Sequence, residues 1–293
     1  MTPLGFIGLG AMGAPIARKL QEAGYPLNLW GRRPEPLAPF KERGATVRAN
    51  PSAVAAASDI VFLCVTDTDA VEAVVFGPNG IATGGSAGKI LIDHSSIRPD
   101  ATRSFAEKLN LSCGMGWIDA PVSGGGPGVE NKTLVVMAGG DAPAYERAYP
   151  VVMTYSGRCT LMGPSGAGQA TKLINQTLAG VNFALLAEAT QLALDAGIDA
   201  ARIPEALAGG RADSAVLQEY MPRMVDRTFE PMGTIALMLK DLQTAAALAR
   251  ESGTAMPLTT LAIELHRQLV TAGYGGEDNA AMIRLHDTPG TAG

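Results

Sequence analysis

The stretch Leu4-Gly5-Phe6-Ile7-Gly8-Leu9-Gly10-Ala11-Met12-Gly13 decides the fold that we expect for this chain. Its apolar first half predicts a short buried strand, and the residues from Ala11 to Ala23 predict a helix. The three glycines between strand and helix match G-x-G-x-x-G. Glycine makes up 35 of the 293 residues, so the match alone is weak, and its place between strand and helix carries the weight.

Each glycine has a distinct role in a dinucleotide-binding turn. Gly8 permits the tight turn, Gly10 lets the backbone approach a pyrophosphate, and Gly13 lets the helix pack closely on the strand. The helix N-terminus favours the anion. An ordinary strand–helix turn is the alternative, and the context favours a dinucleotide. The predicted cofactor-binding residues here are Gly8, Leu9, Gly10, Ala11, Met12 and Gly13.

Composition excludes several classes of protein. Hydrophobic residues make up 47% and charged residues 17%, enough apolar mass for a core. The net charge is -5 and the longest basic run is Arg32-Arg33, which argues against a nucleic-acid binder or a membrane-surface protein. The sequence has no uninterrupted apolar run long enough to predict a membrane span. Cysteine and histidine spacings predict neither disulfides nor a metal site, as in a reduced cytoplasmic protein.

The chain changes character near Gly163-Pro164-Ser165-Gly166. Before this point, short apolar runs alternate with helical patterns, which indicates a Rossmann-type, doubly wound α/β sheet. After it only helices are expected, the first from Gly168 to Ala196. We therefore predict a dinucleotide-binding domain at 1–163 and an all-helical substrate and oligomerisation domain at 164–293, with a frayed tail from Asp287 to Gly293. The predicted strands are Leu4–Gly8, Leu27–Gly31, Ile60–Val65, Lys89–Asp93, Trp117–Ala120 and Leu134–Ala138.

The end of the second predicted strand bears on the choice of cofactor. An NAD site usually has an acidic residue there, which binds the ribose 2′-hydroxyl. This chain has Arg32 and Arg33 instead. Guanidinium groups pair with a 2′-phosphate, so we expect NADP to be preferred, with NAD possible. A solvated surface pair is the alternative.

Two further groups of residues suggest a substrate site. Ser123-Gly124-Gly125 follows a strand and offers backbone N–H groups and a hydroxyl to a carboxylate, although a flexible turn is as plausible from sequence alone. Lys172, Asn175 and Gln176 share one helix face. A lysine pointing into an interdomain cleft could protonate a carbonyl oxygen, whereas spacing alone favours a surface lysine.

Four motifs resemble the β-hydroxyacid dehydrogenase family, also called the 3-hydroxyisobutyrate dehydrogenase family. The resemblance extends from Phe6 to about His286. The motifs are Gly8-Leu9-Gly10-Ala11-Met12-Gly13-Ala14-Pro15, Asp119-Ala120-Pro121-Val122-Ser123-Gly124-Gly125, Gly166-Ala167-Gly168-Gln169-Ala170-Thr171-Lys172-Leu173-Ile174-Asn175 and Lys240-Asp241-Leu242.

The resemblance implies roles for particular residues. Lys172 would be the general acid and base, and Ser123, Gly124 and Gly125 would hold the substrate carboxylate, with Asn175 and Gln176 orienting substrate and lysine. On the cofactor side, the resemblance implies backbone contacts from Val65 and Thr66. It implies a nicotinamide contact from Ser96, where the family usually has Thr. It also implies that Lys240 closes over the nicotinamide side of the cofactor and that Asp241 supports this lysine.

The expected activity is NAD(P)-dependent reduction of a small semialdehyde or 2-oxo acid. An Asn-Gln pair at 175–176, in place of the family's common Asn-Asn, resembles the 2-hydroxy-3-oxopropionate (tartronate semialdehyde) reductase branch. The alternatives are a 3-hydroxyisobutyrate or broad β-hydroxyacid dehydrogenase, a glyoxylate and succinic semialdehyde reductase, and a non-catalytic NADP-binding protein. Imine reductases share the fold but usually lack the lysine, so Lys172 argues against them. The long apolar helix and the resemblance predict a homodimer or homotetramer.

Overall fold

The computed structural model describes residues 1–287 and divides into two compact units. The first unit is Met1–Lys172 and the second begins at Leu173. This division falls inside the helix α9 (Ala167–Asp195), shortly after the predicted boundary at residue 164. Residues 288–293, which make up most of the tail expected to fray, lie outside the described part of the chain.

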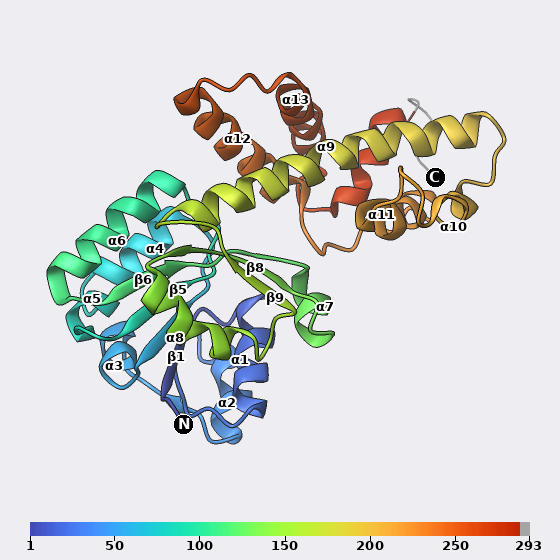
Figure 1. Cartoon of the computed structure of the whole chain (residues 1–293). Helices are drawn as coiled ribbons and strands as arrows, with labels where there is room; N and C mark the ends of the chain where they lie inside the picture. Colours follow the sequence, from blue (N-terminus) through green and yellow to red (C-terminus); the bar gives the residue numbers. More distant parts are fainter. Residues whose placement is uncertain (288–293) are drawn as a thin grey trace. The chain divides into compact units, whose positions relative to one another are not determined.

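The first unit contains the predicted doubly wound sheet (Figure 1). Its parallel strands have the spatial order β3-β2-β1-β4-β5-β6, so the order reverses between β1 and β4. The strand β8 (Val135–Gly140) extends the sheet antiparallel to β6 and to β7 (Val122–Ser123), and parallel to β9 (Arg158–Leu161). The parallel strands are β1 (Leu4–Ile7), β2 (Leu27–Trp30), β3 (Thr46–Val47), β4 (Ile60–Leu63), β5 (Ile90–Asp93) and β6 (Gly116–Asp119).

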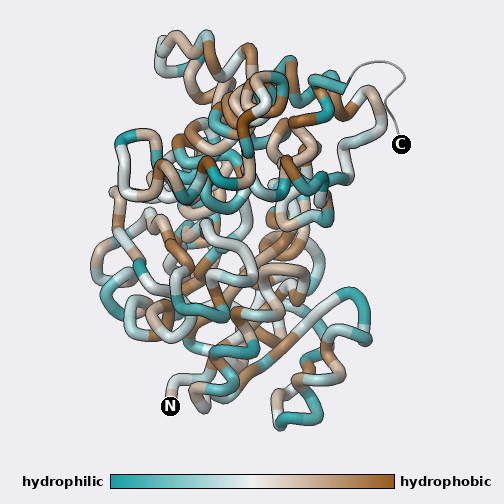
Figure 2. The backbone as a smooth tube through the Cα atoms, turned by 90° about the vertical axis from the view of Figure 1, so that its right-hand side faces the viewer, coloured by the Kyte–Doolittle hydropathy of each residue, from teal (hydrophilic) through white to brown (hydrophobic). Residues whose placement is uncertain are grey.

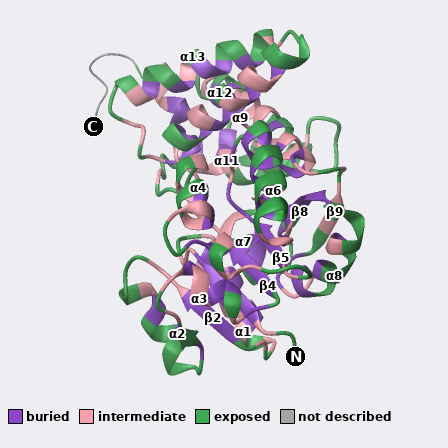
Figure 3. Cartoon of the chain, turned by 90° about the vertical axis from the view of Figure 1, so that its left-hand side faces the viewer, coloured by how far each residue is buried: buried purple, intermediate pink, exposed green. Residues whose placement is uncertain are grey.

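Successive side chains of the central strands enter two separate hydrophobic clusters. Phe6 and Phe62 pack on one face, while Ile7 and Leu63 pack on the other. This alternation is the period-two pattern of a sheet covered on both sides. Figure 3 shows the strands as the most deeply buried part of the unit. One face is covered by α1 (Gly13–Glu22), α2 (Ala38–Glu42) and α8 (Ala142–Val152), and the other by α3 (Pro51–Ala56), α4 (Thr68–Phe76), α5 (Ile81–Gly84) and α6 (Pro99–Cys113).

The second unit is helical, as predicted. Its core includes Phe183, Met221 and Leu242, and apolar and polar residues alternate along its helices (Figure 2). The stretch 279–286 was expected as an ordinary helix and is instead the tighter 3₁₀ form. The elements after α9 are η2 (Ala200–Arg202), α10 (Ile203–Leu207), α11 (Ala215–Val225), α12 (Ile235–Ser252), α13 (Pro257–Thr271) and η3 (Asn279–His286).

Within residues 1–287, α9 is the one helix long and apolar enough to cross a membrane by length and composition. The core helix of a soluble protein passes the same test. The first turns of α9 carry the polar side chains of Gln169, Lys172 and Gln176, and the contacts described below bind Gln169 and Gln176 to other parts of their own units.

Candidate active site

The loop that follows β1 contains three glycines with different structural requirements. Gly8 has a positive φ of 96°, and a Cβ atom there would lie 2.1 Å from the carbonyl oxygen of Cys64. A Cβ atom on Gly13 would lie 1.9 Å from the carbonyl oxygen of Gly8. Gly10 has no neighbour within 4 Å of the same position. Packing therefore forces glycine at the first and third positions, whereas the second is left open.

This geometry fits the pyrophosphate of a dinucleotide. The helix α1 begins at Gly13, two residues later than the predicted start at Ala11, and Met12 is its N-cap residue. The first turn of α1 contains no acidic residue, and Met12 provides no side-chain cap. The N-terminal N–H groups of such a helix attract an anion, and open space at Gly10 lets the backbone approach it.

A second loop lies beside the glycine loop at the point where the strand order reverses. It follows β4 and contains Val65 and Thr66. A Cβ atom on Gly8 would lie 3.3 Å from Cγ1 of Val65, so the two loops are in contact. Dinucleotides bind at such a reversal point in open α/β sheets. The Thr66 hydroxyl donates to Asp67, 2.7 Å away, and Asp67 in turn caps α4 by accepting from the N–H of Ala70.

Arg32 and Arg33 come directly after β2, where they were expected. Ile7 and Trp30 are paired in register on β1 and β2, so Gly8 and Gly31 leave the sheet side by side. Both arginines are exposed, and the first acidic residue after the strand is Glu35. The strand that ends beside the glycine loop is thus followed by two arginines and not by a carboxylate.

Beyond these loops, buried polar groups fix the beginning of α9. Asp119 ends β6 and is fully buried. Its two carboxylate oxygens accept hydrogen bonds from the backbone N–H groups of Gly166, at 2.8 Å, and Gln169, at 2.9 Å. Burial raises the pKa of Asp119, and these hydrogen bonds oppose the shift. The carboxylate thereby ties the end of β6 to the first turn of the helix that carries Lys172.

The side chain of Gln169 ties the same turn to the loop after β5. Its Nε2 atom donates to the carbonyl oxygen of Ser95 at 2.6 Å, and its Oε1 atom accepts from the N–H of Ile97 at 3.2 Å. Gln169 is only 1% exposed. One buried amide therefore holds the backbone on both sides of Ser96, which is itself partly exposed.

Asp93 completes this network at the end of β5. It pairs in register with Asp119 on β6, and both are fully buried. One carboxylate oxygen of Asp93 accepts from the N–H of Ser95 at 2.9 Å, and the Ser95 hydroxyl oxygen accepts from the N–H of Val65 at 3.0 Å. Burial, with a smaller contribution from Asp119, raises the pKa of Asp93 to about 7. We call Asp93, Ser95, Asp119 and Gln169 the buried polar network.

His94 lies directly after β5 and serves as a packing residue. Its ring nitrogens contact the carbonyl oxygen of Ala120 at 2.5 Å and the Tyr155 hydroxyl at 2.8 Å. Burial lowers the pKa of His94 to about 4, so the ring is neutral near pH 7. Its ring also stacks on Phe62.

The predicted carboxylate-binding turn has a defined conformation. Ser123 lies in β7 and pairs with Val135 of β8. Gly124 and Gly125 follow with positive φ angles of 119° and 61° and lead into α7 (Gly125–Glu130). A Cβ atom on Gly126 would meet nothing within 4 Å. The structure therefore places an ordered turn with open space at Gly126, where the sequence left a flexible turn equally plausible.

Lys172 is the last residue of the first unit and lies three residues after Gln169 on α9. In the second unit, the following residues of α9 form a chain of polar contacts with α12. The Asn175 amide donates to Gln176 at 2.9 Å, and the Gln176 amide donates to Asp241 at 2.7 Å. Asp241 is buried and forms an ion pair with Lys240 at 3.2 Å. The structure thus joins Asn175, Gln176, Asp241 and Lys240.

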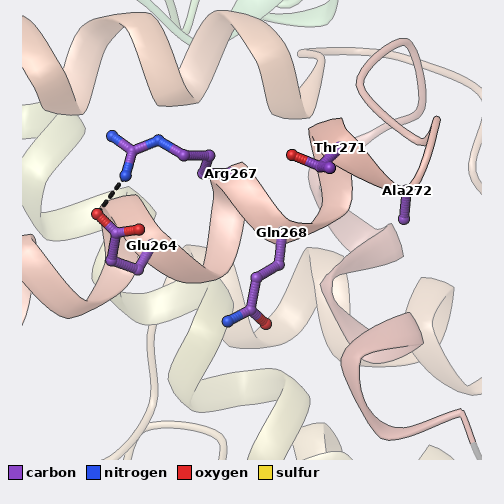
Figure 4. Close-up of a pocket in the computed structure, with 5 residues that line it drawn as sticks. All are labelled: Glu264, Arg267, Gln268, Thr271 and Ala272. Atoms are coloured by element: carbon purple, nitrogen blue, oxygen red, sulfur yellow. Dashed lines mark hydrogen bonds and ion pairs between the residues drawn. The ribbon is translucent and has the colours of Figure 1, made fainter.

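A surface pocket of about 370 Å³ lies on α13, and none of these residues lines it (Figure 4). Its lining comes from that one helix and the residue that follows it, and the Arg267 guanidinium is paired with Glu264. It adds nothing to the candidate site. The lining residues are Glu264, Arg267, Gln268, Thr271 and Ala272.

Comparison with known proteins identifies the family. Residues 3–163 match the family model of the NAD-binding domain of 6-phosphogluconate dehydrogenase, and residues 166–286 match that of the NAD-binding region of NADP-dependent 3-hydroxyisobutyrate dehydrogenase. The chain is 38% identical to 2-hydroxy-3-oxopropionate reductase of Escherichia coli K12, with 96% of each chain covered. The chain belongs to the 3-hydroxyisobutyrate dehydrogenase family.

Other members of the family agree in sequence and in fold. L-Threonate dehydrogenase of Cupriavidus necator is 33% identical over 99% of this chain and 98% of its own. The crystal structure of 3-hydroxyisobutyrate dehydrogenase from Salmonella typhimurium superposes with a TM-score of 0.87 and 29% identity, over 97% of this chain and 100% of that one. This β-hydroxyacid dehydrogenase is therefore an NAD(P)-dependent oxidoreductase, as the sequence motifs predicted. The alternative of a non-catalytic NADP-binding protein is set aside.

Proposed function

We propose that this family member is an NADP-preferring reductase of a small semialdehyde or 2-oxo acid, with 2-hydroxy-3-oxopropionate (tartronate semialdehyde) as the first candidate substrate. The observation that carries the proposal is the anchoring of α9: Asp119 and Gln169 fix the turn that precedes Lys172 to the ends of β6 and β5. The similarity to the E. coli reductase and the Asn175-Gln176 pair support the choice of substrate.

In this proposal each group of residues has one task. NADPH supplies a hydride to the carbonyl carbon when bound. Lys172 gives a proton to the carbonyl oxygen in the reductive direction and takes it back in the oxidative one. Ser123 and the N–H groups of the Gly124-Gly125 turn bind the substrate carboxylate. Asn175 and Gln176 orient the substrate and the lysine by hydrogen bonds.

The cofactor would be held by the loops at the reversal point of the sheet. The backbone from Gly8 to Gly13 binds the pyrophosphate, and Val65 and Thr66 flank it. Ser96 and Lys240 contact the nicotinamide end of the cofactor. Arg32 and Arg33 pair with the 2′-phosphate, and their position after β2 without a strand-end carboxylate supports the preference for NADP.

We also propose that the protein is a cytoplasmic homodimer or homotetramer that binds a small carboxylate-bearing substrate and neither nucleic acid nor membrane. One face of α9 supports self-association, because Ile174, Leu178, Leu185 and Leu192 are exposed at helical spacing. Apolar stripes of this kind are normally covered by another helix. Light scattering at micromolar concentration tests this proposal, and a monomer contradicts it.

A substrate panel tests the proposed activity. The purified enzyme is supplied with NADPH or NADH and with tartronate semialdehyde, succinic semialdehyde, glyoxylate and methylmalonate semialdehyde, and the nicotinamide absorbance is followed. 3-Hydroxyisobutyrate and L-threonate are tested in the oxidative direction, because relatives that act on them share the whole chain. We expect the highest kcat/KM with tartronate semialdehyde and NADPH. A higher value with another substrate assigns the enzyme to that branch and overturns the choice of substrate.

A further inference from the structure

We propose that Gln169 is a positioning residue for the reaction: its buried amide sets the place of Ser96 relative to Lys172. The proposal rests on the proposed function in one respect, since it takes Lys172 and Ser96 as the residues that act at the substrate and at the nicotinamide. Gln169 itself is too deeply buried, at 1% exposure, to be a direct ligand.

The side chain of Gln169 binds the backbone on both sides of Ser96. The amide nitrogen and oxygen bind the Ser95 carbonyl and the Ile97 N–H, which belong to the two peptide groups that flank Ser96. A single side chain thereby replaces the backbone pairing that a strand would supply. Ser96 follows the end of β5 by three residues, and the register of β5 with its neighbours ends at Asp93.

The backbone of Gln169 is fixed as firmly as its side chain. Its N–H donates to the buried carboxylate of Asp119, which also holds Gly166. Gln169 is thus fastened to β6 through its backbone and to the loop after β5 through its side chain. Lys172 follows three residues later, within the next turn of the same rigid helix. A change in the length or polarity of this one side chain alters the separation of Ser96 and Lys172.

A purely structural buried amide would not have this consequence, and the chain offers one for comparison. Asn28 in β2 is buried and donates to the carbonyl oxygen of Ala57 and to Ser58 at 3.0 and 3.1 Å, and it accepts from Arg48 at 2.8 Å. It therefore makes at least as many hydrogen bonds as the side chain of Gln169, but it braces parts of the first unit that carry no proposed catalytic group.

The experiment compares Gln169→Leu with Asn28→Leu, using both turnover and a readout that needs no turnover. The second readout is the emission of NADPH bound to the full chain, which reports the surroundings of the nicotinamide ring. We expect Gln169→Leu to shift this emission toward that of free NADPH, to lower kcat by about 10- to 100-fold and to change NADPH affinity by less than about threefold, because small misplacements at a reacting centre cost about that much. Asn28→Leu should lower the melting temperature and leave the emission and kcat unchanged.

A second variant keeps the proposal testable if Gln169→Leu does not fold. Gln169→Glu retains the acceptor for the Ile97 N–H and lacks the donor for the Ser95 carbonyl until its carboxyl is protonated. The emission of bound NADPH should therefore return toward the wild-type spectrum as the pH is lowered, which a general loss of stability does not produce. Wild-type emission in both variants, or an equal change in Asn28→Leu, overturns the proposal. Failure of the wild-type enzyme on every semialdehyde in the panel contradicts the proposed function instead, and the emission still decides the role of Gln169.

Discussion

The glycine loop after β1 and the buried polar network after β5 and β6 place backbone atoms by opposite means. In the loop, side chains are absent: Gly8 and Gly13 leave no room for a Cβ atom, and Gly10 is open. In the network, side chains do the placing, because Asp119 and Gln169 are buried with their polar atoms bonded to backbone groups. The difference indicates that the loop serves close approach of a ligand, whereas the network holds residues at a fixed separation.

The largest effect that we predict concerns the helix fixed by the network. Lys172→Ala should lower kcat by about 10²- to 10⁴-fold while NADPH affinity stays nearly unchanged, because general acid catalysis contributes that much and the cofactor is bound by other residues. Lys172→Arg should restore little, since a guanidinium is a poor proton donor. Steady-state kinetics and a fluorescence titration of NADPH provide the check. Substantial rescue by arginine, with the alanine defect confined to KM, would assign the lysine to binding alone.

The next prediction concerns how the buried Asp93 makes the stability of the protein depend on pH. Asp93 has its pKa raised from 3.8 to about 7, so the native state binds this proton more tightly than the unfolded state. Stability from this group is therefore present at low pH and falls as the pH rises from about 4 to about 7, by an amount on the order of 4 kcal/mol at most.

The variant Asp93→Asn isolates this contribution from those of His94 and Asp119. It keeps an acceptor for the N–H of Ser95 but has no proton to lose. Relative to wild type, its melting temperature should rise steadily between pH 4 and pH 8, whatever the offset at low pH. Parallel melting curves for the two proteins across this range would show that Asp93 does not carry the pH dependence.

A smaller effect is expected beside the glycine loop. The double change Arg32→Ala and Arg33→Ala should weaken NADPH binding by roughly tenfold or more and leave NADH binding nearly unchanged, because one charge-assisted contact contributes about 1.5–3 kcal/mol. Dissociation constants for both cofactors, measured by fluorescence titration, provide the check. Equal losses of affinity for NADPH and NADH would show that the arginines do not recognise the 2′-phosphate.

The smallest effects are expected at Gly10, in the loop after β1, and at Gly126, in the turn after β7. Gly10→Ala and Gly126→Ala both add a methyl group where nothing lies within 4 Å, so neither should lower the melting temperature. Both substitutions restrict the unfolded chain, which favours folding by about 0.4–1 kcal/mol. We expect Gly10→Ala to weaken NADPH binding a few-fold and Gly126→Ala to raise only the KM of the substrate. Identical kinetic effects of the two variants would contradict the assignment of separate ligands to the two turns.

Sequence reasoning predicted one of these regions well and the other poorly. The glycine loop, the strands that flank it and the arginines after β2 depend on neighbouring residues, so their pattern is readable in the chain. The bonds of Asp119 and Gln169 join partners 47 to 74 residues apart, and all four residues of the network resemble ordinary polar positions in the sequence. Asp119 and Gln169 belong to two of the motifs that resemble the family, but that resemblance implies no role for either in fixing the start of α9.

Short elements were missed for a related reason. The strands β3 and β7 have two residues each, and β9 alternates half-exposed apolar with polar residues, so none shows a clear hydrophobic run. The helices α2, α3 and α5 are also short, and capping or packing rather than periodicity defines them. Asn50, for example, caps α3 by accepting from the N–H of Ala53.

The two-residue strand β3 has a consequence for behaviour at high concentration. It forms one border of the sheet, and both of its residues, Thr46 and Val47, are exposed. A border this short offers few unpaired backbone groups to the sheet of a second molecule, and natural sheets avoid edge-to-edge aggregation in this way. We therefore expect copies of this enzyme to associate through helices such as α9, while strand-mediated fibre growth from the β3 border is suppressed.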